Sequence, residues 1–291
     1  MCLSPEEFLS FDQSLLLISW PSCCAYRLSQ RKKDGRKKVK ASGEKWAARL
    51  LQACALLSSG SMLARHFLEL PLNATAVLPW ASLMSLAYMT VPVPEMPLDD
   101  FVPWWSLFVI LVAKVVGTEE MRTALGLQAG RLDGGPLAWS ILCAIISTFA
   151  LVGWSCYVRG DHGPIQNALA PLMSPVTVFP FAVLNALREE LQFRMVFLGA
   201  LIAGEASKCI PLMAYQMAVH SGYFALLHFL GGFPTGKSGF ALVFTWSLFL
   251  DLLRVWSGGM AFVFLLHVQA DVAIFVLVWL EDQRRKARAE L

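Results

Sequence analysis

The chain has 291 residues, of which 56% are hydrophobic and only 15% are charged, and its formal net charge is +3. Soluble domains carry about 25% charged residues, so this composition excludes an ordinary soluble protein and predicts an integral membrane protein. No basic face on a soluble domain is visible, which excludes nucleic-acid binding.

The first 48 residues are predicted to form a cytosolic basic head that is poorly ordered. A short apolar run over 14–20 precedes residues 31–40, which contain seven basic residues and one acidic residue. Basic segments beside a first membrane span keep that side in the cytosol. A nuclear-localisation signal and a lipid-headgroup site are the alternative interpretations of this cluster.

The apolar segments that follow predict an all-α fold, a polytopic integral membrane helix bundle with about eight transmembrane helices. A basic cytosolic tail over 282–291 follows the last segment. Two basic ends require an even number of crossings, and eight crossings place both ends in the cytosol. The expected spans cover about 50–68, 73–94, 101–117, 137–158, 176–203, 209–230, 239–256 and 259–280.

The fifth apolar segment contains four charged residues, Arg188, Glu189, Glu190 and Arg194. An ionisable side chain at the bilayer centre costs about 2.5–3.5 kcal/mol on insertion scales, so these groups must pair, reach water or do chemistry. Glu190 and Arg194 are four residues apart, share one face of an α-helix and are predicted to pair. Glu189 is offset by about 100° and lacks this partner, so it is the candidate general base. A buried ion network that holds the bundle together is the structural alternative.

Two later segments carry imidazoles. Phe224 and His228 share a helix face, and His220 precedes them by about two turns, although a histidine in a span more often serves only as a hydrogen-bonding residue. In the last segment, His267 and Asp271 are four residues apart, so they can hydrogen-bond along the helix or both bind a metal. Carboxylates, imidazoles and a guanidinium from three helices that pack together are the groups of a water-activating site.

Three motifs therefore occur in the order Glu-Glu-x-x-x-Arg, Phe-x-x-x-His and His-x-x-x-Asp, at residues 189–194, 224–228 and 267–271. This order resembles the type II CAAX prenyl protease family of intramembrane glutamate proteases. That family includes the Ras-converting endoprotease and the abortive-infection-type membrane proteins. The resemblance covers roughly residues 120–280.

The resemblance implies a CAAX-protease-like catalytic membrane domain over 119–281, preceded by additional N-terminal transmembrane helices over 49–118. The implied enzyme is an endopeptidase that removes the C-terminal tripeptide of a prenylated CAAX protein with an activated water. Its partners would be prenylated proteins and the lipid bilayer, and no cofactor is implied. Access from the cytosolic face favours the endoplasmic reticulum membrane, with a plastid membrane or a plasma membrane as alternatives.

The resemblance also implies a role for each matched position. The glutamate of the first motif and the histidine of the second would polarise and deprotonate the water, and the third motif would stabilise the oxyanion, a function often worth about 2.7–4 kcal/mol per donor. The remaining residues would orient the site, with the phenylalanine as packing. The implied catalytic residues are Glu189, His228, His267 and Asp271. The implied supporting residues are Glu190, Arg194 and Phe224.

Position 271 departs from the Ras-converting type, in which asparagine is usual. Asparagine can donate a hydrogen bond to an oxyanion, whereas an ionised aspartate only accepts. Asp271 would then either orient His267, as a carboxylate does in a catalytic triad, or carry a proton itself. Because of this difference, we expect a substrate range that is broader than, or different from, that of the Ras-converting type.

Three alternatives remain open. A metal-dependent enzyme would use Glu189, His228 and His267 as zinc ligands. A family member without a prenyl substrate would be an immunity or scaffold-type membrane protein, or a protease of other transmembrane substrates. A proton-coupled transporter would use the glutamates and histidines as a relay, but such folds often repeat broken helices in both halves, and here the ionisable cluster lies in one half.

Overall fold

The computed structural model describes residues 13, 16, 19, 49–50, 52–59, 74–88, 98–157, 170–203, 210–230 and 233–289. These residues form helices joined by short turns, with no strand among them, which confirms the all-α fold. The helices are α3 (Ala74–Tyr88), α4 (Leu98–Val116), α5 (Glu119–Leu125), α6 (Gly134–Tyr157), η2 (Ala170–Leu172), α8 (Val178–Glu189), η3 (Glu190–Leu198), α9 (Gly199–Ile202), α10 (Ile210–Leu230), α11 (Gly236–Ser257) and α12 (Ala261–Ala289).

Three helices, α6, α11 and α12, are long and apolar enough to cross a membrane, which confirms three of the predicted spans. A shorter apolar segment, Trp105–Val115 within α4, falls inside the predicted span 101–117. Helix α10 matches a predicted span in position, but Gln216, His220 and His228 lower its apolar character. The count of eight spans therefore stays a prediction.

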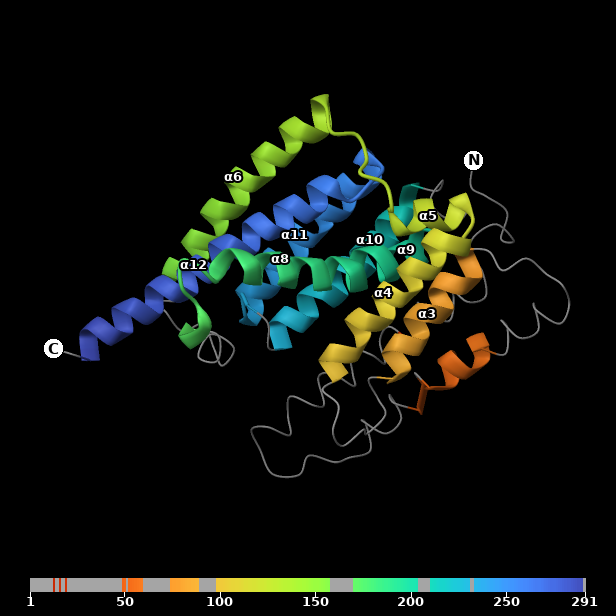
Figure 1. Ribbon diagram of the computed structural model, residues 1–291, viewed down its shortest axis with the longest axis horizontal. Helices are drawn as coiled ribbons and strands as arrows, with labels where there is room; N and C mark the ends of the chain where they lie inside the picture. Colours follow the sequence, from red (N-terminus) through yellow and green to blue (C-terminus); the bar gives the residue numbers. More distant parts are fainter. Residues whose placement is uncertain are drawn as a thin grey trace, which may run out of the picture. The chain divides into compact units, whose positions relative to one another are not determined.

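The chain divides into two compact units, one of residues Met1–Leu127 with Leu191–His220 and one of Gln128–Glu190 with Ser221–Leu291. Within the first unit, α3 and α5 both pack against α4 and α9. Within the second unit, α12 packs against α6, α8 and α11 (Figure 1). The domain boundaries expected from the sequence stay predictions.

The predicted head contributes buried residues to the first unit. Gln13 and Ser19 are helical, and they are 1% and 0% exposed. The Gln13 amide donates to the carbonyl oxygens of Ala200 at 3.1 Å and Ala203 at 3.0 Å, at the C-terminal end of α9. These bonds satisfy carbonyls that a helix end leaves without intrahelical partners. The basic cluster 31–40 lies outside the described residues.

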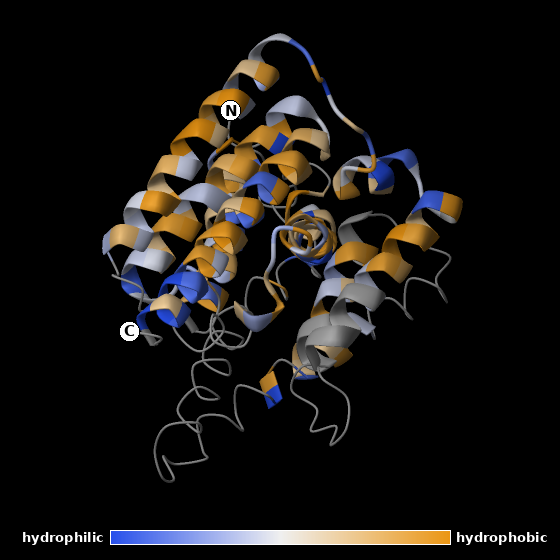
Figure 2. Ribbon diagram, turned by 60° about the vertical axis from the view of Figure 1, so that its left-hand side comes forward, coloured by the Kyte–Doolittle hydropathy of each residue, from blue (hydrophilic) through white to orange (hydrophobic). Residues whose placement is uncertain are grey.

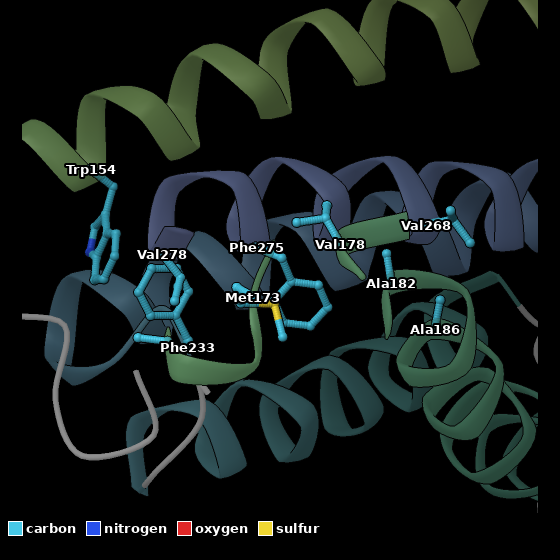
Figure 3. Packing of buried hydrophobic residues seen from close by; sticks show 10 residues of the cluster. Trp154, Met173, Val178, Ala182, Ala186, Phe233, Val268, Phe275 and Val278 are labelled. Atoms are coloured by element: carbon cyan, nitrogen blue, oxygen red, sulfur yellow. The ribbon is translucent and has the colours of Figure 1, made fainter. Parts of the chain in front are cut away.

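The core of the second unit lies where α8 packs along α12 (Figure 3). Ala182 and Ala186 are four residues apart on α8, and both are completely buried. Small side chains at this spacing let two helices approach closely. The next turn of α8, which carries Glu189, is thereby brought to α12. The buried cluster comprises Trp154, Ala170, Met173, Val178, Ala182, Ala186, Phe233, Val268, Phe275 and Val278.

The predicted span 176–203 is helical, but its winding changes within the charged motif. Helix α8 ends at Glu189, and the chain continues as the π-helical segment η3. A π-helix has i→i+5 backbone bonds and occurs often at functional sites. The four-residue spacing of Glu190 and Arg194 therefore no longer implies a shared α-helical face. Their pairing stays a prediction.

The loop before α6 holds the start of α12. The Met260 N–H donates to the Gln128 carbonyl at 3.1 Å, and the Ala261 N–H donates to the Ala129 carbonyl at 3.2 Å. These bonds satisfy two of the N–H groups that a helix N-terminus leaves without partners. Because His267 lies in the second turn of α12, the loop also helps to position that side chain.

Replacing Gly259 by alanine should destabilise the protein, because the backbone of the loop before α6 lies directly against this glycine. A Cβ at this position would lie 2.3 Å from Gly130 N and 2.4 Å from Ala129 C, so the loop must move. We expect the free energy of unfolding in detergent to fall by about 1–3 kcal/mol. The matched control is Gly153→Ala in α6, where a Cβ meets no atom within 4 Å. A Gly259→Ala protein as stable as this control would contradict the prediction.

Helix α12 continues beyond its apolar part as a charged helix, which covers most of the predicted tail 282–291. Lys286 Nζ lies 2.7 Å from an oxygen of Asp282, and Arg285 Nε lies 3.8 Å from an oxygen of Glu281. Figure 2 shows hydrophilic residues at this C-terminal end of the chain. Exposed pairs of this kind stabilise a helix only weakly, so the tail is helical mainly because it continues the span.

Candidate functional site

Three segments of the second unit carry the ionisable residues that the sequence predicts for the site. Helix α8 ends at Glu189, and Glu190 follows as the first residue of η3. Helix α10 carries His228, and α12 carries His267 and Asp271 one turn apart. All five residues belong to the same compact unit.

His267 lies at the centre of this cluster, with carboxyl groups at both nitrogens of its ring. Its Nδ1 is 2.5 Å from Glu190 Oε1, a short hydrogen bond. Its Nε2 is 3.4 Å from Glu189 Oε2 and 3.8 Å from Asp271 Oδ2. The predicted hydrogen bond between His267 and Asp271 is therefore an ion-pair contact, since 3.8 Å exceeds the hydrogen-bond range.

The two adjacent glutamates differ in how far they are buried. The Glu190 side chain is 3% exposed, whereas the Glu189 side chain is 20% exposed. The Glu189 Oε2 atom itself is buried and accepts no hydrogen bond from the residues that the structure describes. Buried acceptors nearly always have a partner, so this oxygen has the capacity to bind a donor from water or substrate. Glu189 is thus the more accessible carboxyl group.

Asn185 joins the carboxyl groups of Glu189 and Asp271. Its Nδ2 donates to Glu189 Oε1 at 3.2 Å and to Asp271 Oδ2 at 3.0 Å. Asn185 is not among the site residues predicted from the sequence. The available signal was its position four residues before Glu189 in an otherwise apolar segment, which places both side chains on one helix face.

His228 and Phe224 lie together on α10. The His228 Nδ1 is 2.9 Å from the Phe233 carbonyl oxygen. Since a carbonyl only accepts, Nδ1 is the donor, and in the neutral ring Nε2 carries the free lone pair. The Phe224 ring lies against both imidazoles, with centroids 4.9 Å from that of His228 and 6.2 Å from that of His267. Phe224 therefore contacts both histidine rings and restricts their movement.

An apolar cavity of about 530 Å³ reaches these residues. Helices α6 and α11 provide most of its lining, and His228, His267 and Asp271 provide polar groups. Trp139 of α6 packs against Phe249 of α11 with ring centroids 5.7 Å apart. Pockets for small organic ligands typically measure about 300–1,000 Å³. The cavity can accommodate an apolar group and bring an attached polar group to the histidines.

Two ionisable residues considered in the sequence, Arg194 and His220, belong to the other compact unit. Both are completely buried. The His220 ring packs against Phe197, with centroids 5.8 Å apart. Any role of these two residues in the His267 cluster stays a prediction.

Helix α11 contributes two buried charged residues that are not among the predicted site residues. Asp251 is 0% exposed and Arg254 is 3% exposed. The Ser221 hydroxyl donates to Asp251 Oδ2 at 2.9 Å, which ties α10 to α11. Charged residues inside a membrane span are a signal of functional or structural importance. That signal was present in the sequence at both positions.

Within the described part of the chain, no group of three His, Cys, Asp or Glu side chains is arranged to hold a metal ion. The zinc alternative, with Glu189, His228 and His267 as ligands, stays a prediction.

These features define an all-helical membrane protein in which buried carboxyl and imidazole groups meet an apolar cavity. Residues 171–273 match the family described as type II CAAX prenyl endopeptidase Rce1-like. The matched segment contains all three motifs and confirms the resemblance predicted from them. The match indicates a protease-type membrane domain. Comparisons with curated proteins and with solved structures gave no match.

Proposed function

We propose that this protein is an intramembrane endopeptidase that removes the C-terminal tripeptide of prenylated CAAX proteins. The observation that carries the proposal is the apolar cavity lined in part by His228, His267 and Asp271. An isoprenoid chain in this cavity would leave its attached peptide beside these groups. The family match over 171–273 supports the protease chemistry.

In the proposed reaction, Glu189 and His228 activate a water molecule. Glu189 Oε2 accepts no hydrogen bond from the described residues, and His228 has its Nε2 lone pair free because Nδ1 donates to Phe233. The water loses a proton to this pair while its oxygen attacks the scissile carbonyl carbon. The carbon–nitrogen bond then breaks, and the proton passes to the leaving amine. A positioned general base of this kind contributes about 10²–10⁴-fold to a rate.

His267 is the proposed donor to the oxyanion that forms on the carbonyl. Glu190 holds its Nδ1, so Nε2 is directed toward Glu189 and Asp271. Asp271 accepts a hydrogen bond from Asn185, so we assign it to orienting His267 rather than to donating. This assignment accommodates aspartate at a position where the resemblance leads one to expect asparagine. Arg194 is proposed to help orient the site.

The proposal places the enzyme in the endoplasmic reticulum membrane with eight crossings and both basic ends in the cytosol. Three helices of suitable length and composition support a multi-pass chain. A prenylated protein would then reach the site from the cytosolic face. No cofactor is proposed.

The proposal is tested with purified protein in detergent and a farnesylated CAAX peptide. The matched substrate is the same peptide without the farnesyl group. We expect release of the terminal tripeptide, detected by mass spectrometry, from the farnesylated peptide only. A folded protein that cleaves neither peptide would contradict the proposal, and cleavage of both would favour a protease of other substrates. Loss of cleavage on adding a chelator, reversed by zinc, would favour the metal-dependent alternative.

Filling the cavity should weaken substrate binding. Ala150 of α6 lines the cavity, and a tryptophan there would occupy space that we assign to the isoprenoid chain. Overpacking costs about 1–3 kcal/mol, so we expect Ala150→Trp to raise KM for the farnesylated peptide about tenfold, since about 1.4 kcal/mol is a factor of ten. The control is Ile145→Trp on the same helix, at a residue that is 50% exposed and outside the cavity lining. Equal KM values for the two variants would contradict this use of the cavity.

A further inference from the structure

We infer that Asn185 is a positioning residue of the site, whose amide holds Glu189 of α8 and Asp271 of α12 in one arrangement and directs Glu189 Oε2 toward the reacting water. This inference rests on the proposed hydrolase function. Asn185 does not line the cavity, so its effect on the reaction passes through the two carboxyl groups.

The cluster needs a donor that adds no charge. Glu189, Glu190 and Asp271 surround His267, all within 3.8 Å of its ring nitrogens. Carboxylates brought together in a site of low dielectric repel each other strongly. The Asn185 NH₂ group has two hydrogens, and each has a carboxyl oxygen as acceptor. The amide thus joins two like groups without adding a further charge.

The amide also selects which oxygen of Glu189 is available. Asn185 donates to Oε1 at 3.2 Å, whereas Oε2 accepts no hydrogen bond from the described residues. With Oε1 engaged, rotation of the carboxyl group would break this bond. Oε2 therefore stays on the side of His267, from which it is 3.4 Å away.

A reciprocal relation links positions 185 and 271. An amide on α8 faces a carboxyl group on α12 across 3.0 Å. A hydrogen bond between these two positions requires one donor and one acceptor, and either position can supply the donating amide. The chain has the amide at 185 and the acid at 271, so exchanging the two should preserve the bond between these positions, while Glu189 loses its donor at 185.

The first variant removes the amide. Asn185→Leu should lower kcat for the farnesylated peptide about 10- to 100-fold, the range expected for a lost hydrogen bond to a charged group, and leave KM nearly unchanged. The matched control is Gln269→Leu, which removes an amide that bonds Ser147 and Thr148 of α6; Ser147 lines the cavity, but Gln269 itself does not. The control should lower the unfolding temperature to a similar extent without changing kcat.

The second variant pair tests the reciprocal relation. Asn185→Asp places a further carboxyl group against Glu189 and Asp271 and should reduce kcat at least as much as Asn185→Leu. Adding Asp271→Asn to it restores an amide facing an acid, and we expect about a tenfold recovery of kcat, as for residues in one hydrogen-bonded network. A merely structural role of Asn185 would not produce this recovery in kcat.

The outcomes separate this inference from the proposed function. If the wild type does not cleave the peptide, the proposed function fails and the inference is overturned with it. If the wild type cleaves and Asn185→Leu keeps its kcat, only the positioning role is overturned. A fall in kcat shared equally by Gln269→Leu, or no recovery in the double variant, would also overturn it.

Discussion

Glu189→Gln is expected to lower the rate of tripeptide release about 10²–10⁴-fold, the contribution of a positioned general base. Glutamine has nearly the same size, and its side-chain carbonyl can still accept the hydrogen bond from Asn185, but it cannot take a proton from water. The fold should therefore persist while the reaction stops. The measurement is single-turnover release of the tripeptide in detergent, together with thermal unfolding of the same samples.

Two control variants sharpen this experiment. Glu119→Gln changes an exposed glutamate of α5 that pairs with Arg122 at 3.4 Å, so its rate should equal that of the wild type. Glu190→Gln should reduce stability as well as rate, because Glu190 is buried against His267. A Glu189→Gln protein with the wild-type rate would show that another group activates the water. Full biological activity without cleavage would favour the immunity or scaffold alternative.

His267→Leu is expected to lower the free energy of unfolding by about 3–5 kcal/mol, the cost of leaving buried charges without their partner. The leucine fills part of the volume of the ring but leaves Glu189, Glu190 and Asp271 facing an apolar side chain. Catalysis should also be lost, since the proposed oxyanion donor is removed. Chemical unfolding in detergent measures the first effect, and peptide cleavage measures the second.

A second substitution tests the cause of this instability. Glu190 has the shortest contact with His267, at 2.5 Å, so Glu190→Leu in the His267→Leu protein removes the closest uncompensated carboxyl group. We expect stability to recover in part, because replacing a whole buried pair by apolar residues is often neutral. A double variant less stable than His267→Leu alone would contradict an electrostatic cause.

The hydropathy of the chain was sufficient to predict α6, α11 and α12 as membrane helices, because long apolar runs have few other stable arrangements in a lipid bilayer. The charged residues of the first and third motifs were conspicuous because they interrupt apolar segments of this kind. Spacing rules were less reliable. The four-residue rule for Glu190 and Arg194 assumes an α-helix, but the chain forms a π-helix from Glu190.

Other features of the site had weak sequence signals. Asn185 is a single uncharged polar residue in an apolar run, and only its distances to Glu189 and Asp271 reveal its position between them. Asp251 and Arg254 were visible as charges in a span, but the hydrogen bond between Asp251 and Ser221 depends on how α10 packs against α11. Helix packing depends on the shapes of the side chains along both helices. The sequence pattern of one segment therefore cannot predict it.

The sequence by itself determined the membrane class, the helical fold and the residue types of the site, because these follow from local hydropathy and from the high cost of charge in lipid. Only the tertiary structure decided which carboxyl groups face which nitrogen of His267, and which glutamate stays accessible. It also decided that the histidines line an apolar cavity between α6 and α11. His267 and Glu190, for example, lie 77 positions apart in the sequence, so these relations arise from packing between helices rather than from spacing within one.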